Sequence, residues 1–251
     1  MKTTEILSTQ FKYINNNSQE FLKICLPYFL LMVLNFYIPE NFPLFYFDSV
    51  AITVDDLCSL VMYVVVTLMI VNIHRYMIIE DKNYYSFKER LKPTFRYACY
   101  GILLLVISFA PVVLFYASFL FFTSAASNIL PESISLIIIG VSFLIMIFCM
   151  LLVYPSFALI LPIAAIGEKV EVFKMWKLSK GFKLTIFLQF FIVWVVFLLI
   201  LTPLYMWIGE GLLYNLFSSF LVLLAYILVI SSLSKTYLLW KDERVSQLKS
   251  V

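Results

Sequence analysis

Long apolar stretches without Asp, Glu, Lys or Arg alternate with short charged segments along the chain. An α-helix rises about 1.5 Å per residue, so about 20 apolar residues cross a hydrocarbon core about 30 Å thick. Four stretches reach that length alone, and the first two reach it with apolar residues beyond Lys23 and Arg75, whose long side chains extend to the headgroups. The pattern predicts six transmembrane helices, at about residues 21–38, 57–79, 97–122, 134–166, 184–208 and 212–234.

The composition agrees with this pattern. Hydrophobic residues make up 63% of the 251 residues, charged residues make up 13%, and the mean hydropathy is +0.98. Soluble domains are about 45–50% apolar and about 25% charged. A soluble globular protein is therefore excluded. We expect one all-α domain over residues 1–251, a polytopic integral membrane protein with six transmembrane helices and interfacial amphipathic helices.

Positive charge lies on only one side of the predicted helices. All 18 Lys and Arg residues precede the first helix, follow the sixth, or lie between the second and third or between the fourth and fifth. The opposite side carries only acids, namely Glu40, Asp48, Asp55, Asp56, Glu132 and Glu210. Because loops rich in Lys and Arg stay in the cytoplasm, both termini are expected there. The basic face should attract anionic lipid headgroups.

The basic segment 168–183 has the pattern of an amphipathic helix. Its apolar residues share one face of a 3.6-residue period, and its lysines cluster on the other. Such a helix lies along the membrane surface. The predicted contacts with anionic lipids are Lys169, Lys174, Trp176, Lys177 and Lys180. Weaker patterns of this kind occur near Ile6 to Ile14 and before Pro93. The alternative is that these segments merely anchor a helix bundle with short loops.

The fourth predicted helix is too long for a straight crossing. Residues 133–167 would extend about 50 Å as one helix, so this segment must tilt, bend or break. Prolines release backbone carbonyls, which need other partners inside a membrane. A polar pocket is therefore predicted here, lined by Tyr154, Pro155, Ser156 and Pro162. The alternative is a proline kink that only improves packing.

The end of this helix and the segment after it carry a motif, made of Tyr154-Pro155, Leu161-Pro162, Glu168 and FKMWKLSKG at residues 173–181. The motif resembles the signature of a six-helix bacterial membrane-domain family. That family includes the membrane domain of some glycerophosphodiester phosphodiesterases and the YciC-like inner-membrane proteins of unassigned activity. The likeness departs from the family pattern at Met175, where a serine is expected. It implies a membrane domain of the same fold in a bacterial inner membrane, and it assigns no catalytic residue to this chain.

Residues for hydrolytic chemistry are scarce. Metal-dependent hydrolysis needs several His and carboxylate ligands at one centre, and the chain has one histidine, His74. We expect His74 at the cytoplasmic end of the second helix, against the helix C-terminus and the headgroups. The sequence Thr53 to Asp56 is typical of a capped helix start, with a cation site as the alternative. No enzyme activity, cofactor or metal is expected.

Transport is the main alternative function. Ion-coupled carriers place ionisable residues in midspan, whereas the clearly internal polar residues here are neutral. They are Ser59, Thr67, Ser108, Ser142, Gln189 and Ser218. We therefore expect a non-enzymatic membrane domain that interacts with anionic lipids or with a membrane-protein partner. The alternative is a small-molecule or lipid transporter that uses the proline-broken fourth helix. No nucleic-acid binding is expected, because membrane topology already explains the basic loops.

Overall fold

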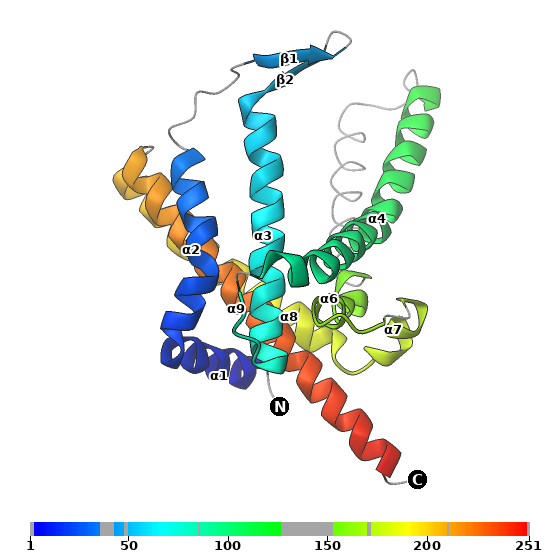
Figure 1. Ribbon diagram of the computed structural model, residues 1–251. Coiled ribbons are helices and arrows are strands. Elements are labelled where there is room, and N and C mark those ends of the chain that lie inside the picture. The colour runs from blue at the N-terminus through cyan, green and yellow to red at the C-terminus, as the bar shows by residue number, and fades with distance from the viewer. Residues whose placement is uncertain are drawn as a thin grey trace.

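The computed structural model describes residues 3–35, 43–47, 50–84, 86–126, 153–169, 172–209 and 211–249. Most of them are helical, as the sequence predicts (Figure 1). The helices are α1 (Thr3–Asn16), α2 (Ser18–Asn35), α3 (Val54–Ile79), α4 (Phe87–Ala126), α6 (Ile160–Ala165), α7 (Val172–Leu178), α8 (Lys183–Ile208) and α9 (Leu212–Lys249). One antiparallel hairpin is formed by β1 (Pro43–Phe47) and β2 (Val50–Thr53).

Three helical segments are long and apolar enough to cross a membrane: Asp56–Ile79, Lys183–Ile208 and Leu213–Glu243. They match the second, fifth and sixth predicted spans, except that the last continues beyond its predicted end at 234, and they indicate a membrane-embedded protein. Helix α2 covers most of the first predicted span, and α4 covers the third but begins earlier, at Phe87. Residues 36–38 and 134–152 lie outside the described residues, so the count of six transmembrane helices stays a prediction.

The β-hairpin between α2 and α3 was not predicted. Tyr46 pairs with Ala51 and Phe47 pairs with Val50. Aromatic and β-branched residues favour strands. However, the two strands have only five and four residues, which is too few for an alternating pattern to stand out from the neighbouring apolar helices.

The start of α3 has the predicted cap. Thr53 Oγ1 accepts a hydrogen bond from the Asp56 backbone N–H at 3.2 Å, and the Asp56 carboxylate accepts one from the Thr53 N–H at 2.8 Å. This reciprocal arrangement satisfies donors that a helix start otherwise leaves unpaired. The capping role is thus confirmed for Asp56. The Asp55 side chain lies outside the described part of the structure, as do Glu40, Asp48, Glu132 and Glu210.

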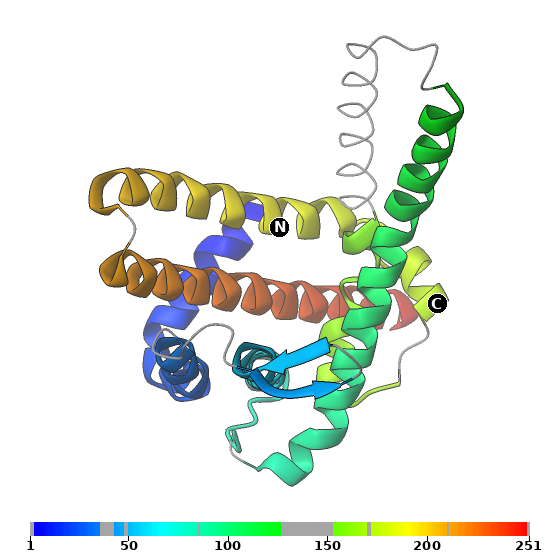
Figure 2. The same ribbon diagram turned by 90° about the horizontal axis from the view of Figure 1, so that it is seen from above.

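Helix α9 holds the bundle together. It packs against α8, α3, α1 and α2. Figure 2 shows α8 and α9 side by side, with α2 and α3 across α9 from α8. A second core surrounds α6, whose residues are all buried and which packs against α3 and α4. The fold thus joins a helical layer around α9 to a core around α6.

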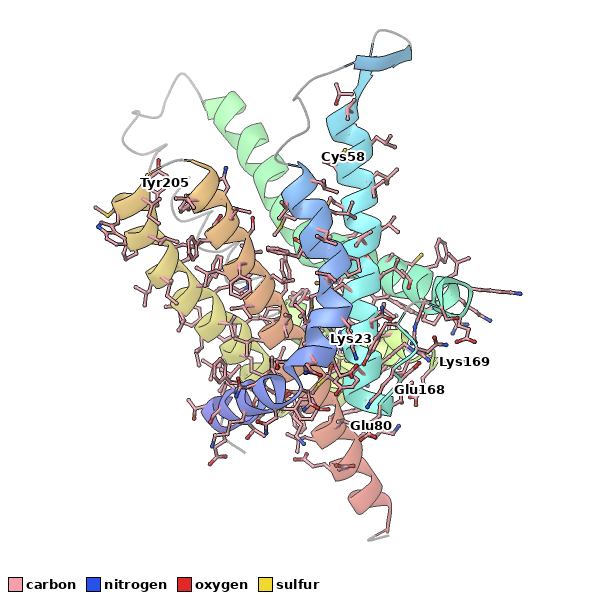
Figure 3. The ribbon with its side chains drawn as sticks, turned by 60° about the vertical axis from the view of Figure 1, so that its left-hand side comes forward. Lys23, Cys58, Glu80, Glu168, Lys169 and Tyr205 are labelled. Carbon is pink, nitrogen blue, oxygen red and sulfur yellow. The ribbon has the colours of Figure 1, made fainter. Side chains whose placement is uncertain are left out.

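The helix ends that carry the basic loops gather at one end of the molecule. Figure 3 shows Lys23, Glu80, Glu168 and Lys169 towards this end, with Cys58 and Tyr205 towards the opposite one. The end with Lys23 and Glu168 comprises α1, the first turns of α2 and α4, the last turn of α3, α7 and the C-terminal part of α9 (Figure 1). This part of the molecule is referred to below as the basic end.

Neutral polar side chains pair across the α9 interfaces. Gln189 of α8 donates to Thr236 Oγ1 of α9 at 3.0 Å, and both residues are fully buried. His74 of α3 lies 2.7 Å from Ser234 Oγ through its Nδ1, and it is also fully buried. The expected contact between His74 and headgroups is therefore wrong. The sequence places His74 near a helix end, but α9 extends past that end and covers the imidazole ring.

We expect Thr236→Val to destabilise the protein because it leaves the amide of Gln189 without its buried partner. Polar pairs between membrane helices contribute about 0.6 kcal/mol on average, and losing one partner leaves a desolvated group, so a loss of about 1 kcal/mol is expected. The matched control is Thr202→Val, because Thr202 is exposed and bonds only within its own helix, to the Leu198 carbonyl. Thermal unfolding in detergent micelles measures both. Equal losses in the two variants would show that the α8–α9 pair contributes nothing.

Candidate functional site

A cluster of ion pairs forms at the basic end, where the chain passes from α3 to α4. Helix α3 stops at Ile79, and Glu80 caps it in the left-handed conformation, with φ 54°. This sharp turn brings Asp81 back against the last turn of α3. Its Oδ2 accepts hydrogen bonds from Arg75 at 2.8 Å and from Arg90 at 2.7 Å. One carboxylate therefore serves two guanidinium groups, and the three side chains together carry an excess positive charge.

Arg90 is the most buried member of this cluster. Its side chain is 1% exposed. One guanidinium nitrogen bonds Asp81, and the other donates to the Asn83 carbonyl at 2.8 Å. Its Nε–H finds no acceptor among the described residues. Because a desolvated charge is costly unless all its donors are satisfied, this nitrogen marks Arg90 as a candidate binding group.

Asn72 and Tyr84 connect the cluster to α2. Asn72 Nδ2 donates to the Tyr84 carbonyl at 3.2 Å, and the Tyr84 hydroxyl donates to Glu20 at 2.9 Å. Lys23 also bonds Glu20, at 3.0 Å. The hydrogen bonds from Lys23 and Tyr84 lower the pKa of the Glu20 carboxyl, and burial raises the pKa of the Tyr84 hydroxyl. The Oδ1 of Asn72 has no partner in the described part of the chain.

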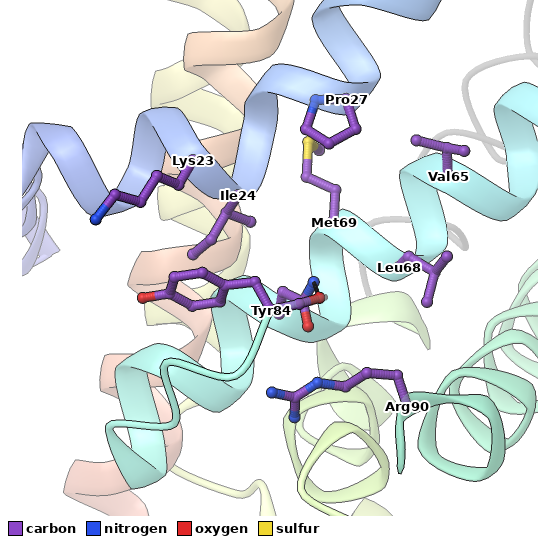
Figure 4. A pocket seen from close by; sticks show the side chains of 9 residues that line it. Lys23, Ile24, Pro27, Val65, Leu68, Met69, Tyr84 and Arg90 are labelled. Carbon is purple, nitrogen blue, oxygen red and sulfur yellow. Dashed lines mark hydrogen bonds between the residues drawn. The ribbon is translucent and has the colours of Figure 1, made fainter. Parts of the chain in front are cut away.

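These groups surround a cavity of about 200 Å³ between α2, α3 and the start of α4. Figure 4 shows Arg90 on one side of it and Pro27 and Met69 on the other, with Tyr84 between them. The lining residues are Lys23, Ile24, Pro27, Val65, Leu68, Met69, Asn72, Tyr84 and Arg90. The cavity, named here the α2–α3–α4 cavity, was not predicted. Its walls come from three segments of the chain, and the only local signal was a lone Asn inside an apolar helix.

Two more arginine contacts join α6 to the helices around it. Arg96 donates to the Gly167 carbonyl at 3.0 Å, and Arg75 donates to the Ala165 carbonyl at 3.4 Å. The carbonyls at a helix C-terminus have no partner within the helix and carry partial negative charge, so cations stabilise them. Just beyond these carbonyls, the Tyr237 hydroxyl of α9 donates to Glu168 at 3.2 Å. Arginines of α3 and α4 thus donate hydrogen bonds to the carbonyls at the C-terminal end of α6.

The predicted pocket residues of the fourth span lie in a broken helix. Residues 153–157 are helical, a turn follows at 158–159, and α6 begins at Ile160. The helix is therefore broken, which is one of the three outcomes predicted for this segment. Pro155, Ser156 and Pro162 are buried, and the Ser156 carbonyl accepts a hydrogen bond from Ser179 Oγ at 2.7 Å. The Tyr154 ring packs edge-on against Phe190. These contacts hold the segment against Ser179 and α8, and the polar pocket stays a prediction.

The predicted amphipathic helix is shorter than residues 168–183, because α7 has only seven residues. A turn follows it, with Gly181 at φ 103°, a conformation that favours glycine. Met175 of α7 is 3% exposed, whereas Trp176 is 45% exposed and lies under the Lys183 ammonium, 3.9 Å from the ring centroid.

Three of the lysines of this segment face the solvent. Lys169, Lys177 and Lys180 are exposed, and the Lys174 side chain lies outside the described part. An exposed row of lysines beside a half-exposed tryptophan fits a membrane surface. Whether the segment contacts lipid remains a prediction.

Comparisons with protein-family models, curated proteins and solved structures find no match to this chain. The resemblance of residues 154–181 to a six-helix membrane-domain family therefore stays an expectation. Within the described residues, no group of three or more His, Cys, Asp and Glu could hold a metal ion.

We expect Asp81→Asn to destabilise the protein strongly, because it leaves Arg75 and Arg90 without a counter-charge. Removing one partner of a fully buried ion pair costs about 3–5 kcal/mol, and because the Asp81 side chain is 21% exposed a smaller loss of about 2 kcal/mol is expected. The matched control is Asp242→Asn, an exposed acid in α9 for which a change near zero is expected. Chemical unfolding of both variants in detergent checks this. A small loss of stability in Asp81→Asn would mean that water already solvates the two guanidinium groups.

Proposed function

We infer that this protein is a non-enzymatic membrane domain that binds anionic lipids through a basic cytoplasmic face. The observation that carries the proposal is the distribution of charge. Every Lys and Arg lies on one side of the apolar helices, and the opposite side carries only acids. By the positive-inside rule this side faces the cytoplasm, where it meets the anionic leaflet. A membrane-protein partner would dock on the same face.

Electrostatics gives the proposal a magnitude. Each Lys or Arg close to an anionic membrane surface contributes about 1 kcal/mol, which is about a fivefold preference for anionic over neutral lipid. The attraction falls off within a Debye length of about 8 Å, so only residues near the headgroups contribute. Exposed Lys177 and Lys180 beside half-exposed Trp176 have the required chemistry. Tryptophan favours the membrane interface, and lysine extends its charge to the headgroups.

Transport through the fourth span has one observation in its favour, the break in the helix at residues 158–159. The break lies in a tightly packed region, since Ala158 and Leu159 are fully buried and Ser156 is bonded to Ser179. A lipid-binding role needs no pathway through this region. For that reason we place transport second.

The triple variant Lys174→Gln, Lys177→Gln, Lys180→Gln should reduce the preference for anionic lipid by at least about fivefold, since it removes three charges beside the headgroups. The full chain would be reconstituted with equal parts of phosphatidylglycerol and phosphatidylcholine. Mass spectrometry would then quantify the lipids that remain bound after detergent extraction. The matched control carries arginine at the same three positions and should retain the preference. An unchanged ratio in the glutamine variant would contradict the proposal for this segment.

A further inference from the structure

Two of the residues that line the α2–α3–α4 cavity each have one buried polar atom without a partner, and the two atoms are of opposite kind. The Arg90 Nε–H is a donor without an acceptor, and the Asn72 Oδ1 is an acceptor without a donor, among the described residues. Both residues line the same cavity, and their exposed fractions are 1% and 6%. Buried polar groups in native proteins nearly always have partners. The cavity is therefore suited to a ligand that accepts one hydrogen bond and donates another.

The charge around the cavity favours an anion at the Arg90 end. Asp81 is shared by Arg75 and Arg90, so a single negative charge faces two positive ones. On the α2 side, Lys23 and Glu20 compensate each other. The remaining positive charge is carried by a guanidinium, whose planar N–H groups match the geometry of phosphate oxygens. A phosphate at Arg90 would satisfy both the charge and the unpaired donor.

The apolar part of the cavity favours an amphiphile over a free phosphate. On α3, Val65, Leu68 and Met69 precede Asn72, so apolar walls give way to a polar one over about 10 Å along the helix axis. On α2, Ile24 and Pro27 add further apolar surface. In the proposed orientation the polar end lies towards the cytoplasm. A phospholipid of the inner leaflet has the same order of headgroup and hydrocarbon.

The size of the cavity limits which part of a lipid enters it. About 200 Å³ corresponds to roughly seven water molecules in the liquid, which accommodates a headgroup and its glycerol but not two acyl chains. The chains would lie outside, along the lipid-facing surfaces of α2 and α3. Leu26 and Val64 on these helices are 42% and 43% exposed, as expected of side chains that face hydrocarbon.

We propose that the α2–α3–α4 cavity binds the headgroup of one inner-leaflet glycerophospholipid. Its phosphate accepts hydrogen bonds from Arg90, and a hydroxyl or ammonium group of the same headgroup donates to Asn72 Oδ1. The site rests on the proposed lipid-binding function, and it adds a single specific position to a face that otherwise attracts anionic lipids by charge. Binding would also neutralise the excess charge at the junction of α3 and α4.

Filling the cavity tests the proposal without breaking the ion pairs. Val65→Phe inserts a ring into the apolar wall, and the matched control is Val106→Phe, the same change at an exposed position of α4 that lies outside the cavity and off the proposed path of the acyl chains. Native mass spectrometry of the full chain in detergent, titrated with phosphatidylglycerol, counts bound lipids. We expect one retained lipid in the wild type and in Val106→Phe, with at least about tenfold weaker retention in Val65→Phe. Equal retention in the two variants would overturn the proposal. Should Val65→Phe fail to fold, Leu68→Phe tests the same wall.

Further probes distinguish a phospholipid headgroup from free inorganic phosphate as the ligand. Diacylglycerol lacks a phosphate and should not bind, whereas phosphatidylethanolamine should bind because its ammonium can donate to Asn72. Inorganic phosphate alone should not displace the lipid. Retention of diacylglycerol, or displacement by inorganic phosphate at millimolar concentration, would each overturn the assignment of a phospholipid headgroup.

The two proposals can fail separately. If the glutamine variant at Lys174, Lys177 and Lys180 loses its anionic preference while Val65→Phe keeps its lipid, the cavity site is wrong and the basic face still binds anionic lipids. If the glutamine variant is unchanged while Val65→Phe loses its lipid, general attraction by this segment is wrong and the cavity is the lipid site.

Discussion

The carboxylate of Asp81 is the interaction on which the basic end depends. It accepts hydrogen bonds from Arg75 at the end of α3 and from Arg90 at the start of α4, and its other oxygen accepts the Asn83 N–H. It therefore fixes the turn between the two helices. Arg75 also reaches the Ala165 carbonyl, so the same cluster holds α6 in place. The Arg90 side chain is only 1% exposed, and Asp81 is the acid that pairs with it.

The same constraint connects the fold to function. Because two guanidiniums share one carboxylate, the cluster of Arg75, Asp81 and Arg90 carries one positive charge in excess. The charge lies beside an apolar cavity, at the depth where the helices leave the hydrocarbon core in the proposed orientation. An anionic headgroup is the partner that a membrane supplies in this place. General attraction by exposed lysines and specific binding in the cavity are thus two consequences of one charge distribution.

The sequence predicts what depends on local pattern, and long-range packing decides the rest. Apolar stretches gave α3 and α8 with bounds close to those observed, and the Thr53–Asp56 cap followed from its spacing. They also gave the start of α9, but this helix continues past the predicted end at 234 to Lys249. The burial of His74 could not be predicted, because it depends on α9, far away in the chain. The cavity was missed for a similar reason, since Lys23, Asn72 and Arg90 meet only in the folded bundle. The segment after α6 forms a shorter helix than predicted: α7 ends at Leu178, and a turn with Gly181 at positive φ follows.

The most direct test of the account is the lipid composition around the wild-type protein in its own membrane. The protein would be extracted with a styrene–maleic acid copolymer, which keeps the surrounding bilayer, and its lipids would be quantified by mass spectrometry against the bulk membrane. The account predicts that anionic phospholipids are enriched over the bulk membrane, and that one phospholipid stays bound after transfer to detergent. A lipid composition equal to that of the bulk membrane, with no lipid retained in detergent, would contradict it.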